Sequence, residues 1–290
     1  MLNIIKTKSF KITAALLALV LCVTGVVWHT ATSVSAAELD ITGANVQGYS
    51  LLSSSAGTTP LEGGTNNPAT MSVFVTGGSE TKYNADNVKW THDGTSWVGD
   101  GTMLYEGTGS AQKIYACAPY TEDATNGVVT VNAADQIDWL VATSTDLTSG
   151  SVSLNMTHAL AKLVIVPSFG TEITDKNITK IEIGGMYASG NLNIADNTWS
   201  DLGTANATLE MTNMELPVIP MAECTEFTVT VTMQDGRVFK TTVSLAAVGN
   251  KLEVGTQYNV ALRVGQDKVT IGDITAAPWR NMYGGELATE

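Results

Sequence analysis

The stretch LNMTHALAKLVIV (Leu154–Val166) can be read as a helix or as a strand, and this choice decides the fold. Its Ala-Leu-Ala-Lys-Leu part favours a helix, whereas Leu-Val-Ile-Val favours a strand. Apolar residues alternate in one phase as far as Met156 and in the opposite phase from Ala161 to Ile165. A one-residue slip in a two-residue period is what a β-bulge produces.

A helix of about eight residues between two β-rich runs would lack both caps and length. The sequence therefore predicts a strand with a bulge near Ala159. This reading places Lys162 on the outer side of the strand. It also expects His158 to be bonded to a backbone group at the bulge.

The clearest element elsewhere is TVTVTMQDGRVFKTTVSL (Thr228–Leu245), in which apolar residues alternate with threonines on both sides of Asp235-Gly236. This pattern predicts a β-hairpin with a two-residue turn, because Asp-Gly supplies the positive φ that such turns need. One apolar face and one threonine face are typical of a sheet that is packed on one side only.

Short β-rich runs separated by turn sequences continue through the chain, and helical periodicity is nearly absent. A polar break follows Pro167 and is interpreted as a domain boundary. We predict an all-β, predominantly antiparallel fold made of two β-sandwich domains, residues 37–168 and residues 169–290.

The first 36 residues have the pattern of a signal peptide. Three lysines precede the apolar run ITAALLALVLCVTGVV, and small residues end the segment. We predict cleavage between Ala36 and Ala37. An uncleaved membrane anchor and a lipid on Cys22 are the alternatives; Leu21 stands where a lipobox needs a small residue.

Cleavage would leave 12 basic and 28 acidic residues, so the net charge of the mature chain would be −16. Such an acidic protein cannot bind nucleic acid by neutralising phosphates. We therefore expect neither nucleic acid nor anionic membrane as a partner, and no stable membrane span after cleavage.

Residues that could carry catalysis or bind metal are few. Asp93 follows His92 directly, which in a strand puts the two side chains on opposite faces, and no nucleophile elbow is present. Cys117 and Cys224 each flank a predicted strand, and we expect both thiols to be unpaired. No Cys/His cluster is present, so we predict no cofactor, no metal and no enzymatic activity.

Exposed tryptophans could form a platform on which sugars stack. Trp90 and Trp139 lie in alternating strands, where core packing is expected. Trp97, Trp199 and Trp279 lie nearer turns or the terminus and stay open. Trp97 and Trp199 are the candidate glycan contacts, and a secreted carbohydrate-binding protein is the alternative function.

Seven segments in order resemble the fimbrillin family, the two-domain subunits of type V pili. They extend from about Asp138 to Trp279 and comprise QIDWLVAT, SVSLNMTHALAKLVIV, TKIEIGG, LPVIP, the hairpin, KLEVGTQYNVALRV and VTIGDITAAPW. The resemblance implies two transthyretin-like sandwiches and subunits that join by donor-strand exchange. It also implies a surface or fimbrial location and a role in cell adhesion and pilus assembly.

In that mechanism an N-terminal strand is displaced or removed, and a terminal strand of a neighbouring subunit takes its place. AELDITGANV (Ala37–Val46) is the strand that the resemblance implies is lost, with Leu39 and Ile41 as candidate residues. KVTIGDITAAPW (Lys268–Trp279) is the candidate donating or closing segment; its candidate residues are Val269, Ile271, Ile274 and Trp279.

The chain departs from the family pattern in two ways: the lipobox is poor, and the first arginine of the mature part is Arg237. The partners implied are other pilin-like subunits, the same or accessory, together with host or bacterial surface glycans or proteins.

Overall fold

Strands account for nearly all regular structure in the computed structural model, which describes residues 36–49, 56–61 and 69–279. No α-helix occurs in these residues; the only helical elements are three single-turn 3-10 helices, η1 Thr81–Tyr83, η2 Ala133–Asp135 and η3 Ala246–Val248. The all-β prediction is therefore confirmed. The predicted signal-peptide residues 1–35 and Cys22 lie outside the described residues.

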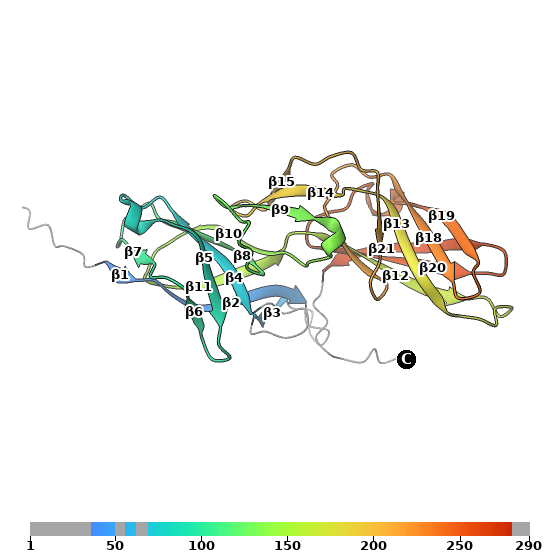
Figure 1. Cartoon of the computed structure of the whole chain (residues 1–290), viewed down its shortest axis with the longest axis horizontal. Coiled ribbons are helices and arrows are strands. Elements are labelled where there is room, and N and C mark those ends of the chain that lie inside the picture. Colours follow the sequence, from blue (N-terminus) through green and yellow to red (C-terminus); the bar gives the residue numbers. More distant parts are fainter. Residues whose placement is uncertain (1–35, 50–55, 62–68, 280–290) are drawn as a thin grey trace, which may run out of the picture. The chain divides into compact units, whose positions relative to one another are not determined.

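The largest sheet has eight strands in the order β3-β2-β11-β10-β8-β4-β5-β6 (Figure 1). Their bounds are β2 Asp40–Tyr49, β3 Ala56–Pro60, β4 Thr70–Thr76, β5 Ala85–His92, β6 Trp97–Gly99, β8 Lys113–Ala118, β10 Leu140–Asp146 and β11 Ser151–His158. All neighbours are antiparallel except β2 and β11. The N-terminal strand β2 is thus held in the sheet by a strand far along the chain.

Two four-stranded sheets follow, with the orders β17-β12-β20-β21 and β16-β13-β18-β19. Their bounds are β12 Ala161–Phe169, β13 Ile178–Met186, β16 Ala207–Glu210, β17 Glu215–Val218, β18 Glu226–Met233, β19 Val238–Ser244, β20 Thr256–Val264 and β21 Val269–Pro278. Only β12 and β20 run parallel here.

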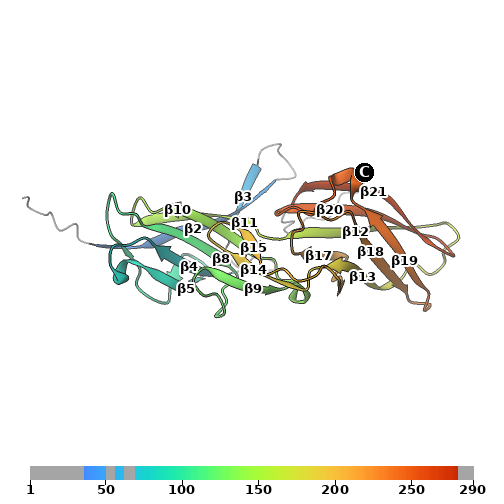
Figure 2. The same ribbon diagram turned by 90° about the horizontal axis from the view of Figure 1, so that it is seen from above.

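A three-stranded antiparallel sheet, β15-β14-β9, joins strands from both predicted halves, and Figure 2 shows these three strands side by side. Their bounds are β9 Val128–Asn132, β14 Ser189–Asn193 and β15 Thr198–Ser200. A short ladder also pairs β1 Ala37–Glu38 with β7 Leu104–Tyr105. Because β9 precedes residue 168 and β14 follows it, one sheet spans the predicted domain boundary.

Strand β8 is buried on both faces. Ile114, Ala116 and Ala118 belong to a core that also contains residues of β2 and β11. Tyr115 and Cys117 point the other way, into a core shared with β9, β14 and β12. A strand covered on both sides is apolar throughout instead of alternating, which explains the sequence KIYACA.

The opening stretch is two strands, not one bulged strand. β11 ends at His158, β12 begins at Ala161, and the two belong to different sheets. All six residues from His158 to Leu163 are buried. The prediction of strand over helix is confirmed, but the bulge near Ala159 is wrong: the phase of the alternation slips because the chain leaves one sheet and enters another.

The hairpin of β18 and β19 is confirmed, but its turn is longer than predicted. The Met233 N–H donates to the Arg237 carbonyl at 2.9 Å, and the Gly236 N–H donates to the Met233 carbonyl at 3.0 Å. Gly236 alone in the loop has positive φ. Asp235 instead accepts the Arg237 N–H through its side chain at 3.0 Å, so the connection is a three-residue loop.

The change of sheet lies between His158 and Ala161, whereas the predicted domain boundary lies at residues 168/169. The described residues, which begin at Ala36, cluster as one compact unit. The division into domains 37–168 and 169–290 therefore stays a prediction.

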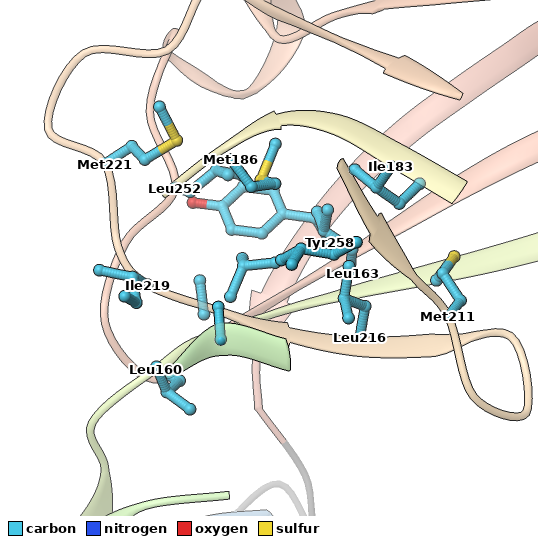
Figure 3. Packing of buried hydrophobic residues seen from close by; sticks show 14 of the residues in the cluster. Leu160, Leu163, Ile183, Met186, Met211, Leu216, Ile219, Met221, Leu252 and Tyr258 are labelled. Atoms are coloured by element: carbon cyan, nitrogen blue, oxygen red, sulfur yellow. The ribbon is translucent and has the colours of Figure 1, made fainter. Parts of the chain in front are cut away.

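Tyr258, from the motif KLEVGTQYNV, is fully buried in the core that β8 shares with β9, β12 and β14 (Figure 3). It lies among Leu163, Met186 and Leu252. Its hydroxyl accepts the backbone N–H of Glu253 at 2.9 Å, and burial raises the pKa of the phenol. The ring fills the core while the hydroxyl closes the loop before β20, the arrangement known as a tyrosine corner.

Replacing Tyr258 with Phe should lower the free energy of unfolding by about 1–2 kcal/mol, because the Glu253 N–H loses its acceptor. Urea denaturation followed by fluorescence measures this difference. Tyr120→Phe is the matched control, since no hydrogen bond of the Tyr120 hydroxyl occurs in the described structure. The Tyr120→Phe variant should have the same free energy of unfolding as the parent protein. Equal midpoints for both variants would refute the role of the Tyr258 hydroxyl.

Burial raises the pKa of the Cys117 thiol to about 12. The folded state therefore holds this proton where the unfolded state has released it, so the contribution of Cys117 to stability is full below pH 9 and falls as pH rises from 9 towards 12. Cys117→Ser should flatten this alkaline loss of stability.

We expect iodoacetamide to alkylate the Cys117 thiol only through unfolding of the protein. Rapid alkylation of Cys117 in the native protein would contradict this prediction.

Candidate functional site

The N-terminal strand β2 contributes an almost fully buried row of side chains. Leu39, just before the strand, and Ile41, Ala44 and Val46 within it are each at most 2% exposed. Their spacing shifts between Ile41 and Ala44 because the register with β11 slips there: Ile41 is opposite Val152, and Ala44 is opposite Leu154. The structure thus places predicted residues Leu39 and Ile41 in one apolar row.

The sequence reading missed Ala44 and Val46. In the sequence, Ile41 and Ala44 are three positions apart in an otherwise alternating apolar pattern. A strict two-residue period does not detect such a shift. Ala36 is the first described residue, and Ala37 begins the short pairing with β7. Cleavage between Ala36 and Ala37 stays a prediction.

The C-terminal strand β21 is the edge strand of its sheet and pairs only with β20. Val269 and Trp279, at its two ends, are buried, whereas Ile271 and Ile274 are half-buried. Ile271, Ile274 and Ala276 lie opposite buried residues of β20, and the register shifts between Ile271 and Ile274. Val269, Ile271 and Ile274 therefore share one face, whereas Trp279 follows the end of the strand. The role of all four residues in strand exchange stays a prediction.

His158 lies where β11 ends, and it is 3% exposed. Its Nδ1 donates to Asp138 Oδ1 at 2.8 Å. The prediction of a backbone partner is therefore wrong, because a carboxylate 20 residues earlier in the chain accepts this hydrogen bond. The ring stacks on Trp279 with centroids 4.1 Å apart and planes inclined by 1°. Its Nε2 is buried without a hydrogen-bond partner in the described structure.

Backbone hydrogen bonds surround the change of sheet beside His158. The Ala159 N–H donates to the Trp139 carbonyl at 2.7 Å, and Trp199 Nε1 donates to the Ala159 carbonyl at 3.1 Å. The Gly255 N–H donates to the Leu160 carbonyl at 2.9 Å. The buried bend is therefore bonded to three separate elements, as buried backbone groups require.

Lys162 is buried and not, as predicted, on an outer side. Its Nζ lies 2.6 Å from Glu215 Oε2 of the neighbouring strand β17 and 5.5 Å from the centre of the Trp279 indole. Buried ammonium groups need such partners. The alternation failed here because strand β12 is covered on both sides near its start.

His92 and His158 are not hydrogen bonded to a nucleophile within the described residues. His92 Nδ1 accepts the backbone N–H of Gly94 at 3.3 Å, and its ring meets Trp97 edge-on. His158 has the orienting carboxylate of a triad, but no hydroxyl or thiol is hydrogen bonded to its ring in the described residues.

The candidate glycan contacts are not open platforms in the described structure. Trp97 is 5% exposed. Trp199 is half-buried, and its indole N–H donates a hydrogen bond to the Ala159 carbonyl. Trp279, which the sequence left open, is buried against His158. A glycan role for Trp97 and Trp199 stays a prediction.

Cys117 and Cys224 are both free and buried, which confirms that the thiols are unpaired. Over the described ranges, no three His, Cys, Asp or Glu side chains gather as metal ligands. Within those same ranges no helix has the length and apolar character to cross a membrane.

The profile of the fimbrillin-like family matches residues 58–279 of this chain. A comparison with curated proteins gave no match.

Several solved structures share the fold. A candidate cell adhesion protein from Bacteroides uniformis has a TM-score of 0.63 and 20% identity, over 84% of this chain and 99% of its own. One from Bacteroides ovatus has a TM-score of 0.67 and 16% identity, over 86% and 100%. The tip fimbrial protein Mfa3 from Porphyromonas gingivalis, with a C-terminal truncation, has a TM-score of 0.51 and 11% identity, over 84% and 100%.

Glu215→Gln should lower the free energy of unfolding by about 1–2 kcal/mol, because it leaves the buried Lys162 ammonium without its anion. Solvent screens part of this interaction, because the Glu215 side chain is 46% exposed. Lys162→Met should cost less, since it removes the charge itself. Thermal and urea denaturation measure both variants.

The control for this pair is Lys113–Asp146, whose atoms are also 2.6 Å apart but whose side chains are 52% and 77% exposed. Asp146→Asn should change stability by less than about 0.5 kcal/mol. If Glu215→Gln were as mild as Asp146→Asn, the buried pair would not contribute to the fold.

Proposed function

Because the chain belongs to the fimbrillin-like family, we propose that it is a non-enzymatic subunit that acts in cell adhesion and joins a fimbrium by donor-strand exchange. The match confirms the resemblance inferred from the sequence motifs. Membership of a fimbrial family implies a place at the cell surface or in a fimbrium. The fold shared with a tip fimbrial protein supports other fimbrial subunits, of the same or another kind, as its partners.

The finer architecture that we propose is a pair of transthyretin-like β-sandwiches, one in each half of the chain. The orders of the two four-stranded sheets support this for the second half. In the first half, the strand that leaves in donor-strand exchange is β2, after cleavage of the signal peptide between Ala36 and Ala37.

Loss of β2 would open an apolar groove along β11. The row from Leu39 to Val46 packs against a core that includes Leu154 and Met156. Its removal would leave both these side chains and the backbone edge of β11 without cover. Such an edge beside an apolar groove binds another chain by β-augmentation.

The observation that carries the proposal is that β21 repeats the spacing of β2. The inward residues of β2 are separated by two, three and two positions, from Leu39 to Val46. Those of β21 have the same separations, from Val269 to Ala276, and its register shift falls in the same place. A β21 strand from a second copy would therefore place Ile271 and Ile274 where Ile41 and Ala44 lie.

A chain that lacks Ala37–Val46 should form species larger than a monomer, whereas the chain from Ala37 should stay monomeric, as measured by light scattering. The shortened chain should also bind a labelled peptide of Lys268–Trp279 in fluorescence anisotropy. The longer chain should not bind it, because β2 already fills the groove.

Two double variants of the peptide test the orientation. The double variant Ile271→Asp and Ile274→Asp should weaken binding by about tenfold or more, because burial of each isoleucine is lost. The double variant Thr270→Asp and Thr275→Asp, on the opposite face, should leave binding nearly unchanged. If the shortened chain is folded and monomeric but does not bind the peptide, the strand-exchange proposal is wrong.

A further inference from the structure

The strand that we propose as the donor is most deeply buried at its two ends. Val269 and Trp279 are the two buried side chains of this segment. Between them, Ile271 and Ile274 are half-buried and pack against the core, and most of the other side chains are exposed. Strands that bury little apolar surface open at low free energy. β2 differs, because its whole inward row is buried. The attachment of β21 therefore depends on its backbone pairing with β20, on the partial packing of Ile271 and Ile274, and on what its ends contact.

The C-terminal end is held by three contacts of Trp279. Its indole stacks flat on the His158 ring with centroids 4.1 Å apart. The Lys162 ammonium lies 5.5 Å from the ring centre, within the range of a cation–π interaction. The Trp279 N–H donates to the Gly255 carbonyl at 2.7 Å.

The ring on which Trp279 stacks is itself fixed, and it belongs to a different sheet. His158 ends β11 in the eight-stranded sheet, while β21 lies in the sheet of β12 and β20. The Asp138 carboxylate, just before β10, holds His158 Nδ1 at 2.8 Å. The stack therefore links β21 to a sheet with which it shares no backbone ladder.

We infer that the His158–Trp279 stack is a latch that keeps β21 on its own subunit and so opposes its donation to another. Opening of the latch frees the C-terminal end of the strand, and the rest then separates from β20 with less apolar surface to expose than the fully buried row of β2. The regulatory meaning rests on the proposed function, whereas the latch is a property of the isolated subunit.

Hydrogen exchange of the monomeric chain from Ala37, followed by mass spectrometry, tests the latch. Trp279→Ala should speed exchange of β20 and β21 amides by about tenfold or more, because the stacked ring no longer holds the strand end. Amides of β13 and β18 should change much less. His158→Gln, which can still bond Asp138 but cannot stack, should give the same local pattern.

Trp97→Ala is the matched control, because Trp97 is an equally buried tryptophan that contacts a histidine, His92, in the other core. It should not speed exchange of β20 and β21 selectively. If Trp279→Ala does not fold, Trp279→Leu keeps apolar volume without the flat stack and serves in its place. The latch is wrong if His158→Gln and the Trp279 variant leave β20 and β21 as protected, relative to β13 and β18, as in the parent chain.

The same variants in the chain that lacks Ala37–Val46 separate this inference from the proposed function. Selective loss of protection without any assembly would support the latch and count against strand exchange. Assembly at the same rate in parent and variants, with protection unchanged, would support strand exchange and overturn the latch. Faster assembly together with faster local exchange would support both.

Discussion

The structure depends on one constraint, the burial of every residue from His158 to Leu163 while the chain passes from one sheet to another. A buried bend cannot leave its backbone groups to water, so each must find a partner in the protein. Trp139, Trp199 and Gly255 supply partners from three separate parts of the chain. These bonds fix where β10, the three-stranded sheet and β20 lie around the bend.

The same burial explains the two polar pairs at this place. Lys162, which the pattern sets on an outer side, is enclosed together with His158, and enclosed polar groups need partners of matched charge or hydrogen-bonding capacity. Asp138 and Glu215 provide them. Trp279, at the end of the last described strand, contacts both the His158 ring and the Lys162 ammonium. The polar groups here are therefore structural, and they connect the C-terminal strand to the eight-stranded sheet.

Strands β2 and β21 have the same apolar spacing but opposite degrees of burial. β2 fills a core with its whole inward row, so its removal exposes a groove. β21 shows most of its side chains to solvent and only partly buries Ile271 and Ile274, so its departure exposes less than that of β2. This contrast suits the proposed strand exchange, in which β2 leaves and β21 of another copy is added. The stack of Trp279 on His158 is what holds the second of them in place.

The sequence alone determined the local structure, because alternation, β-branched residues and turn chemistry act over a few neighbouring residues. It predicted strand over helix at Leu154–Val166, the β18–β19 hairpin, the unpaired cysteines and the family. It did not predict the change of sheet at Ala159, the burial of Lys162 or the Asp138 partner of His158. Each of these depends on strands distant in sequence: two sheets meet at residues 158–163, and a two-residue period records which side a residue faces, not what covers that side.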